Sequence, residues 1–153
     1  MPTHWLPVPH RTQRHKADCL VACVAMVLDY LEKPIDYERL TGLLDIEPDI
    51  GGQASNVRHL SVLGISVYYG TGTLDDLARY IAQGIPCIAF VNTANLSYWP
   101  EASRHAVVVV GWDAERVYLN DPFFEAAPQS ISHLEFELAW EEFDNAYAVL
   151  RLP

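Results

Sequence analysis

The sequence predicts an α+β fold in which helices come first and mostly antiparallel strands follow. Residues 19–31 carry apolar side chains at spacings of three and four, which is typical of a buried helical face. Residues 105–112, HAVVVVGW, are rich in valine and indicate a strand that is buried on both faces. Ser132 and Glu135 form the pattern of a capping box, which places a late helix between the last two strands.

The N-terminal half predicts helices joined by short turns. Proline disfavours a helical conformation in the residue before it, so the first helix should end at Lys33-Pro34. Asp36 can cap a second helix that runs to Leu44. Residues 51–64 read as a glycine-rich turn and a third helix that stops at Gly64, and 65–69 as a short strand. Thr73-Leu-Asp-Asp76 is a variant capping box that opens a helix toward Gly84.

After Gly84 the pattern changes to strands. Residues 85–91 are apolar and contain Pro86, which a sheet accepts at the start or edge of a strand. Residues 113–115 form a turn after the valine-rich strand, and 117–120 return as its hairpin partner. Residues 146–152 supply the closing strand, after a helix that reaches about Phe143.

Length, charge and cysteine content exclude several classes of protein. We expect the 153 residues to form a single domain, 1–153. Ten Lys and Arg side chains against twenty Asp and Glu give a formal net charge of −10, so the chain lacks the basic surface that nucleic acids attract. No apolar run has the length of a membrane span, about 18 residues, and the start lacks the apolar core of an export signal. With three cysteines that cannot all pair, the prediction is a cytoplasmic protein with free thiols and no intrinsic membrane segment.

Cys19 is the candidate nucleophile because it lies where the first helix begins. A thiol reacts as thiolate, and the first turn of a helix stabilises that anion with unpaired N–H groups and the positive end of the macrodipole. Cys23 and Cys87 lie within apolar segments and are predicted to be small core residues. Asp18, directly before Cys19, is expected to act as the N-cap of the helix.

His105 is the candidate base because it begins the valine-rich strand, at the rim of the sheet. A base that shuttles protons needs an acceptor on its second ring nitrogen. Asn120 and Asp121 end the hairpin partner and reach the same rim, but side chains alternate along a strand, so only one of them can face the imidazole. The spacing alone leaves both open. Gln13 carries an uncharged amide that can join the Cys19 N–H as a donor to an oxyanion.

These residues carry a resemblance to a known family. The runs Q-x5-C at 13–19, DCLVAC at 18–23, HAVVVVGW at 105–112 and NDP at 120–122 resemble the papain-like, bacteriocin-processing peptidases that remove double-glycine leaders, together with their stand-alone relatives. The resemblance implies a papain-like fold with Gln13 as oxyanion donor, Cys19 as nucleophile, His105 as base and Asp121 as orienter. Members of that family often have glycine after the nucleophile, where this chain has Leu20.

The resemblance implies a cysteine endopeptidase that acts on a peptide or leader peptide, needs no cofactor or metal, and has a peptide exporter as a possible further partner. Two alternatives use the same residues: a papain-like acyltransferase, and an idle domain that only binds leader peptides. A zinc site at His15, Cys19 and Cys23 is disfavoured because a fourth ligand is missing. Tyr98 and Trp99, in the long loop 92–104, are predicted to bind substrate, with packing over the core as the alternative.

Overall fold

The computed structural model describes residues 3–153. One seven-stranded sheet runs through it. Its strands are β1 (His4–Trp5), β2 (Ser66–Thr71), β3 (Cys87–Asn92), β4 (Arg104–Trp112), β5 (Arg116–Asn120), β6 (Gln129–Ser132) and β7 (Ala146–Arg151). The helices are α1 (Cys19–Tyr30), α2 (Tyr37–Leu43), α3 (Leu74–Ala82) and α4 (His133–Glu141), with two 3-10 helices, η1 (Ala54–Leu63) and η2 (Thr93–Asn95).

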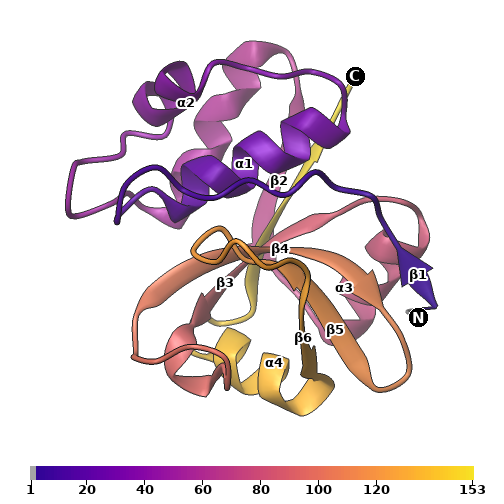
Figure 1. The fold of residues 1–153 in the computed structure, drawn as a ribbon. Helices are drawn as coiled ribbons and strands as arrows, with labels where there is room; N and C mark the ends of the chain where they lie inside the picture. Colours follow the sequence, from indigo (N-terminus) through magenta and orange to yellow (C-terminus); the bar gives the residue numbers. More distant parts are fainter. Residues whose placement is uncertain (1–2) are drawn as a thin grey trace.

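The sheet has the order β2-β7-β3-β4-β5-β6, with β1 added beside β4, and its strand pairs are antiparallel. Helices α1 and α2 lie on one side of it and α4 lies on the other (Figure 1). The predicted α+β class is therefore confirmed. Strand β3 pairs with β4 along its whole length, with Val91 opposite His105, and this register brings the start of β4 to the rim of the sheet.

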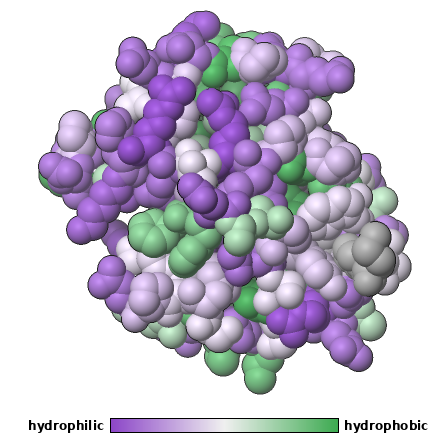
Figure 2. Space-filling view, in the orientation of Figure 1, coloured by the Kyte–Doolittle hydropathy of each residue, from purple (hydrophilic) through white to green (hydrophobic). Residues whose placement is uncertain are grey.

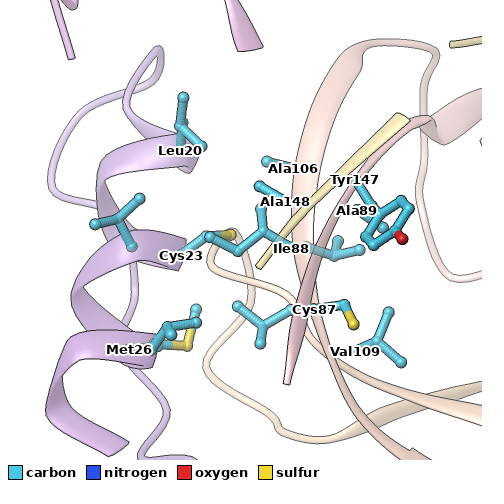
Figure 3. Close-up of a cluster of buried hydrophobic side chains, with 14 of the residues drawn as sticks. Leu20, Cys23, Met26, Cys87, Ile88, Ala89, Ala106, Val109, Tyr147 and Ala148 are labelled. Carbon is cyan, nitrogen blue, oxygen red and sulfur yellow. The ribbon is translucent and has the colours of Figure 1, made fainter. Parts of the chain in front are cut away.

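Helix α1 is buried almost all round because its apolar residues face both the sheet and the surrounding helices. Nine consecutive residues, from Leu20 to Leu28, are buried. Figure 3 shows Cys23 and Met26 of this helix pointing toward Ile88 of β3. Cys23 and Cys87 have no exposed surface, which confirms that both are core residues. Burial, with a contribution from Cys19 and Asp121 nearby, raises the pKa of the Cys23 thiol well above its ordinary value.

Most helix ends follow the predicted caps. Asp36 accepts from the N–H of Arg39 at 3.3 Å, and Thr73 forms the full capping box with Asp76. Ser132 accepts from the N–H of Glu135 at 3.1 Å, although the Glu135 carboxylate itself binds elsewhere.

Three features differ from the prediction. Residues 54–63 form a 3-10 helix, which ends as expected at Gly64 in the left-handed region with φ 79°. Strands β1 and β6 were not predicted, because β1 has two residues and only Ile131 of the four in β6 is buried. Neither segment carries the alternating pattern that marks a strand. None of the helices within residues 3–153 is long and apolar enough to span a bilayer.

Candidate active site

Cys19 is the first residue of α1 and is partly exposed, whereas the nine residues after it are buried. The polar loop 13–18 delivers the chain to this point, and α1 continues directly into the core. A thiol in this position is reachable from solvent and lies beside the N–H groups of the first helical turn. That is the environment in which a thiolate is stabilised.

His105 lies near the start of β4, and its Nε2 is 2.7 Å from Oδ1 of Asp121. The His105 side chain is 4% exposed. Burial alone lowers the pKa of His105, but hydrogen bonds to Asp121 and to Cys19, together with the charges of both groups, raise it to about 9. The imidazole therefore favours its protonated form, bound to the Asp121 carboxylate and under the influence of the nearby Cys19.

Asp121 is fully buried, and four donors converge on its carboxylate. His105 Nε2 and the backbone N–H of Phe123, at 3.0 Å, bind Oδ1. The Tyr98 hydroxyl and the Trp99 indole N–H each donate to Oδ2 at 2.8 Å. Burial by itself raises the pKa of Asp121, but the bonds to His105, Trp99 and Phe123 and the charge of His105 hold it below its ordinary value.

Asn120 points to the other side of the strand, as alternation requires. Its Nδ2 donates to the carbonyl of Val8 at 3.1 Å and ties the N-terminal segment to β5. Of the two candidate orienters, Asp121 is thus the one that contacts His105.

Tyr98 and Trp99, predicted to contact substrate, both donate to Asp121. The Trp99 ring also packs edge-on against His105, at 4.8 Å between centroids, and lines the cleft described below. The loop that carries them is fastened by Glu135, which accepts from the N–H and the hydroxyl of Ser97 at 3.0 and 2.9 Å. Contact with substrate stays a prediction for both residues.

Gln13 lies beside this group of residues. Its backbone N–H donates to the carbonyl of Pro122 at 2.8 Å, which joins the loop before α1 to the segment that follows Asp121. Its side-chain Nε2 donates to the carbonyls of His15 and Lys16, both at 2.9 Å. The amide therefore shapes the loop that leads to Cys19.

Asp18 does not cap α1, so the expected capping role is wrong. Asp18 occupies the N-cap position of α1, but its side chain forms no capping hydrogen bond to the first turn. Asp18 is 3% exposed, and its carboxylate accepts instead from the N–H of His15, at 2.7 Å, and from the Tyr37 hydroxyl. Sequence patterns gave no indication of Tyr37, because the two residues come from separate elements.

A cleft of about 1060 Å³ opens over Cys19 and His105. One wall is the loop 45–53, and the other includes Trp99 and Phe123; Gln13 and Leu20 also line it. Figure 2 shows a group of hydrophobic residues in the middle of this side of the molecule, below the hydrophilic region that covers α1 and α2. Within residues 3–153, no three His, Cys, Asp or Glu side chains are grouped so that they can hold a metal ion.

Comparisons with known proteins identify the family and the fold. The model of the Peptidase_C39 like family matches residues 5–149. No curated protein matches the sequence.

Several solved structures share the fold. A protein described as a C39-like peptidase from Bacillus anthracis superposes with a TM-score of 0.79 at 18% identity, over 98% of each chain. A double glycine motif protease from the AMS/PCAT transporter, in complex with the leader peptide, gives 0.75 at 21% identity over 99% of this chain and 96% of that one. The peptidase domain of Streptococcus ComA, a bi-functional ABC transporter of a quorum sensing pathway, gives 0.76 at 19% identity over 95% and 99%. At these identities the similarity establishes the fold.

Proposed function

The chain belongs to the Peptidase_C39 like family, and we propose that it is a cysteine endopeptidase in which Cys19, His105 and Asp121 form the catalytic triad. The observation that carries the proposal is the position of His105, with Nε2 at 2.7 Å from a buried carboxylate and the ring in the cleft that Cys19 also lines. Nucleophile, base and orienter are then in the order that thiol acyl transfer needs.

In the proposed reaction, the Cys19 thiolate attacks the carbonyl carbon of the scissile peptide and forms a carbon–sulfur bond. The tetrahedral intermediate collapses when protonated His105 gives its proton to the leaving amine, and a thioester remains. Water then attacks the thioester, His105 takes a proton from it, and the thiolate leaves. Asp121 holds the ring in the productive orientation and stabilises its charge throughout.

The oxyanion that forms at the substrate carbonyl needs donors. The backbone N–H of Cys19 and the side chain of Gln13 serve this purpose in the proposal. One N–H of the Gln13 amide turns from a loop carbonyl to the oxyanion when substrate enters, since in the free protein that amide donates to the carbonyls of His15 and Lys16.

The substrate of the proposal is a peptide with a leader segment. The cleft over Cys19 has a volume of about 1060 Å³, which is large enough to take several residues of a peptide. The structural neighbours include a protease in complex with a leader peptide and a peptidase domain of an ABC transporter, which makes an exporter of the processed peptide a suitable partner.

The test is cleavage of synthetic peptides that contain a Gly-Gly site after a leader segment, followed by mass spectrometry. Wild-type protein should cleave them, and Cys19→Ala should abolish cleavage. Cys87→Ala is the matched control, since that thiol is fully buried in β3 and should leave turnover per folded molecule unchanged.

Selective alkylation tests the nucleophile without any substrate. Iodoacetamide at about pH 6 should modify Cys19 well before Cys23 or Cys87, because only a stabilised, accessible thiolate reacts there. Equal rates at the three thiols, or cleavage that survives Cys19→Ala, would falsify the proposal. An added amine that diverts the thioester from hydrolysis would identify an acyltransferase instead.

A further inference from the structure

Helix α1 is the exception among the four α-helices of residues 3–153. The other three begin with a side chain that accepts from the backbone N–H three residues later: Asp36 in α2, Thr73 in α3 and Ser132 in α4. Helix α1 has an aspartate at the same position and no such bond. Aspartate is among the best N-capping residues, so its failure to cap here needs a cause.

The cause lies in the contacts of the Asp18 carboxylate. Oδ2 accepts from the hydroxyl of Tyr37, the first residue of α2, and Oδ1 accepts from the N–H of His15 at 2.7 Å. The backbone of Asp18 has φ −109° and ψ 34°, whereas the three capping residues have extended ψ values between 133° and 167°. Both oxygens of the carboxylate are thus bound on the side away from the first turn.

Tyr37 is itself held firmly. It is 4% exposed, its hydroxyl oxygen accepts from the N–H of Arg14 at 3.2 Å, and the Arg14 guanidinium stacks over its ring at 4.2 Å. A rigid donor of this kind fixes the direction of the carboxylate that it binds.

A capping Asp18 would harm the proposed chemistry in two ways. Its carboxylate would accept from the N–H of Val21, as the caps of the other three helices do from theirs, and so occupy one of the first-turn N–H groups that stabilise the Cys19 thiolate. Its negative charge would also lie beside the sulfur. We propose that Tyr37 is a positioning residue of the active site, which draws the Asp18 carboxylate away from the start of α1 and leaves the first-turn N–H groups to the Cys19 thiolate. The inference rests on the proposed function.

The test uses Tyr37→Phe, which removes the hydroxyl and keeps the ring and its stacking with Arg14. Released from Tyr37, the carboxylate turns toward the first turn, so kcat/KM per folded molecule and the rate of Cys19 alkylation by iodoacetamide at pH 6 should each fall about 10-fold. Tyr30→Phe is the matched control. Tyr30 donates to the carbonyl of Gly84 at 2.8 Å and is the last residue of α1, at the end opposite Cys19, so both rates should stay within twofold of wild type.

A purely structural role for Tyr37 is distinguished by a double-mutant cycle. In an Asp18→Ala background no carboxylate is left to redirect, so adding Tyr37→Phe should change neither rate by more than about twofold. If Asp18→Ala does not fold, Asp18→Asn serves as the background, in which the loss caused by Tyr37→Phe should shrink because the charge is gone. An equal loss in the presence and absence of the Asp18 carboxylate overturns the inference, and so does a Tyr37→Phe protein as fast as wild type in both measurements.

Alkylation separates this inference from the proposed function. A protein that cleaves no peptide, but in which Cys19 alkylation falls with Tyr37→Phe and not in the Asp18→Ala background, would refute the peptidase and support the positioning role. Peptide cleavage with no response to Tyr37→Phe would do the reverse.

Discussion

Asp121→Asn should lower the free energy of unfolding far more than the similar shapes of the two side chains suggest. Trp99→Phe should restore part of that loss. In the wild-type protein, Oδ1 of Asp121 accepts from His105 and from the Phe123 N–H, while Oδ2 accepts from Tyr98 and Trp99 at 2.8 Å each. An asparagine has one oxygen for these four donors. With its oxygen toward His105, its NH2 group faces the indole N–H, which cannot accept.

The magnitude follows from the cost of unpaired donors. Leaving the indole N–H of Trp99 buried against another N–H costs about 1–3 kcal/mol. In the Asp121 protein, Trp99→Phe removes a hydrogen bond to a charged group, worth about 1.5–3 kcal/mol; in the Asp121→Asn protein the same substitution removes a donor that had no acceptor. The lost packing of Trp99 on Phe123, at 4.5 Å between ring centroids, is common to both backgrounds and cancels. The two substitutions should therefore couple favourably by about 2 kcal/mol.

The assay is urea unfolding of the four proteins of this cycle, followed by far-UV circular dichroism because a tryptophan is being removed. Tyr98→Phe in the same two backgrounds is the control: the Tyr98 hydroxyl can rotate to accept from the NH2 group, so its coupling to Asp121→Asn should be smaller. In the opposite orientation the amide oxygen faces Trp99 and the NH2 group faces the Phe123 N–H. Trp99→Phe then removes the donor that favours this orientation, so the amide oxygen turns back toward His105. Additivity of Trp99→Phe and Asp121→Asn within about 0.5 kcal/mol would refute the four-donor account of the carboxylate.

Three further outcomes are expected. Because the pKa of His105 is raised to about 9, kcat/KM should fall as pH rises through that value. The contribution of His105 to folding stability should be complete below its ordinary pKa, near 6.5, and should be lost as pH rises through about 9, which unfolding measured at several pH values would report. Asn120→Ala should keep kcat within about threefold but lower the free energy of unfolding by about 1–2 kcal/mol, since it leaves the Val8 carbonyl without its donor. Gln13→Ala should lower kcat about 100-fold while Cys19 alkylation persists, because alkylation forms no oxyanion; parallel losses in the two assays would assign Gln13 to the loop alone.

The elements that the sequence predicts well are those in which local preference and burial agree. Helix α1 begins and ends within a residue of the apolar pattern, and β4 follows its valine run. The meeting of Cys19, His105 and Asp121 was also predictable in outline, because a helix start and two neighbouring strand ends can share one rim of a sheet. Antiparallel alternation then separates Asp121 from Asn120, but only coordinates say which of them faces the imidazole.

The side-chain contacts of the loop 92–104 could not be predicted from the sequence. Its aromatic residues suggested a surface for substrate, and nothing in their spacing indicated that Tyr98 and Trp99 would donate to a carboxylate more than twenty positions away. Such contacts are set by the way in which the loop folds over the sheet, and here Glu135 at the start of α4 helps to fix that path. Side-chain direction in a long loop is a tertiary property, so local propensity cannot supply it.

At Asp18 the capping rule fails, although aspartate is among the residues that cap helices best. Aspartate before a helix caps it at Asp36, as expected, yet at Asp18 the same residue type in the same position turns to Tyr37. The residue after Asp36 is Tyr37 itself, so one short helix both obeys the capping rule and causes its violation in α1. Proteins commonly depart from local preference at functional sites, where a strained or uncapped arrangement serves the chemistry. An uncapped helix start with a cysteine as its first residue is a departure of that kind. It leaves beside the sulfur a first-turn N–H group to which a capping side chain would otherwise bind.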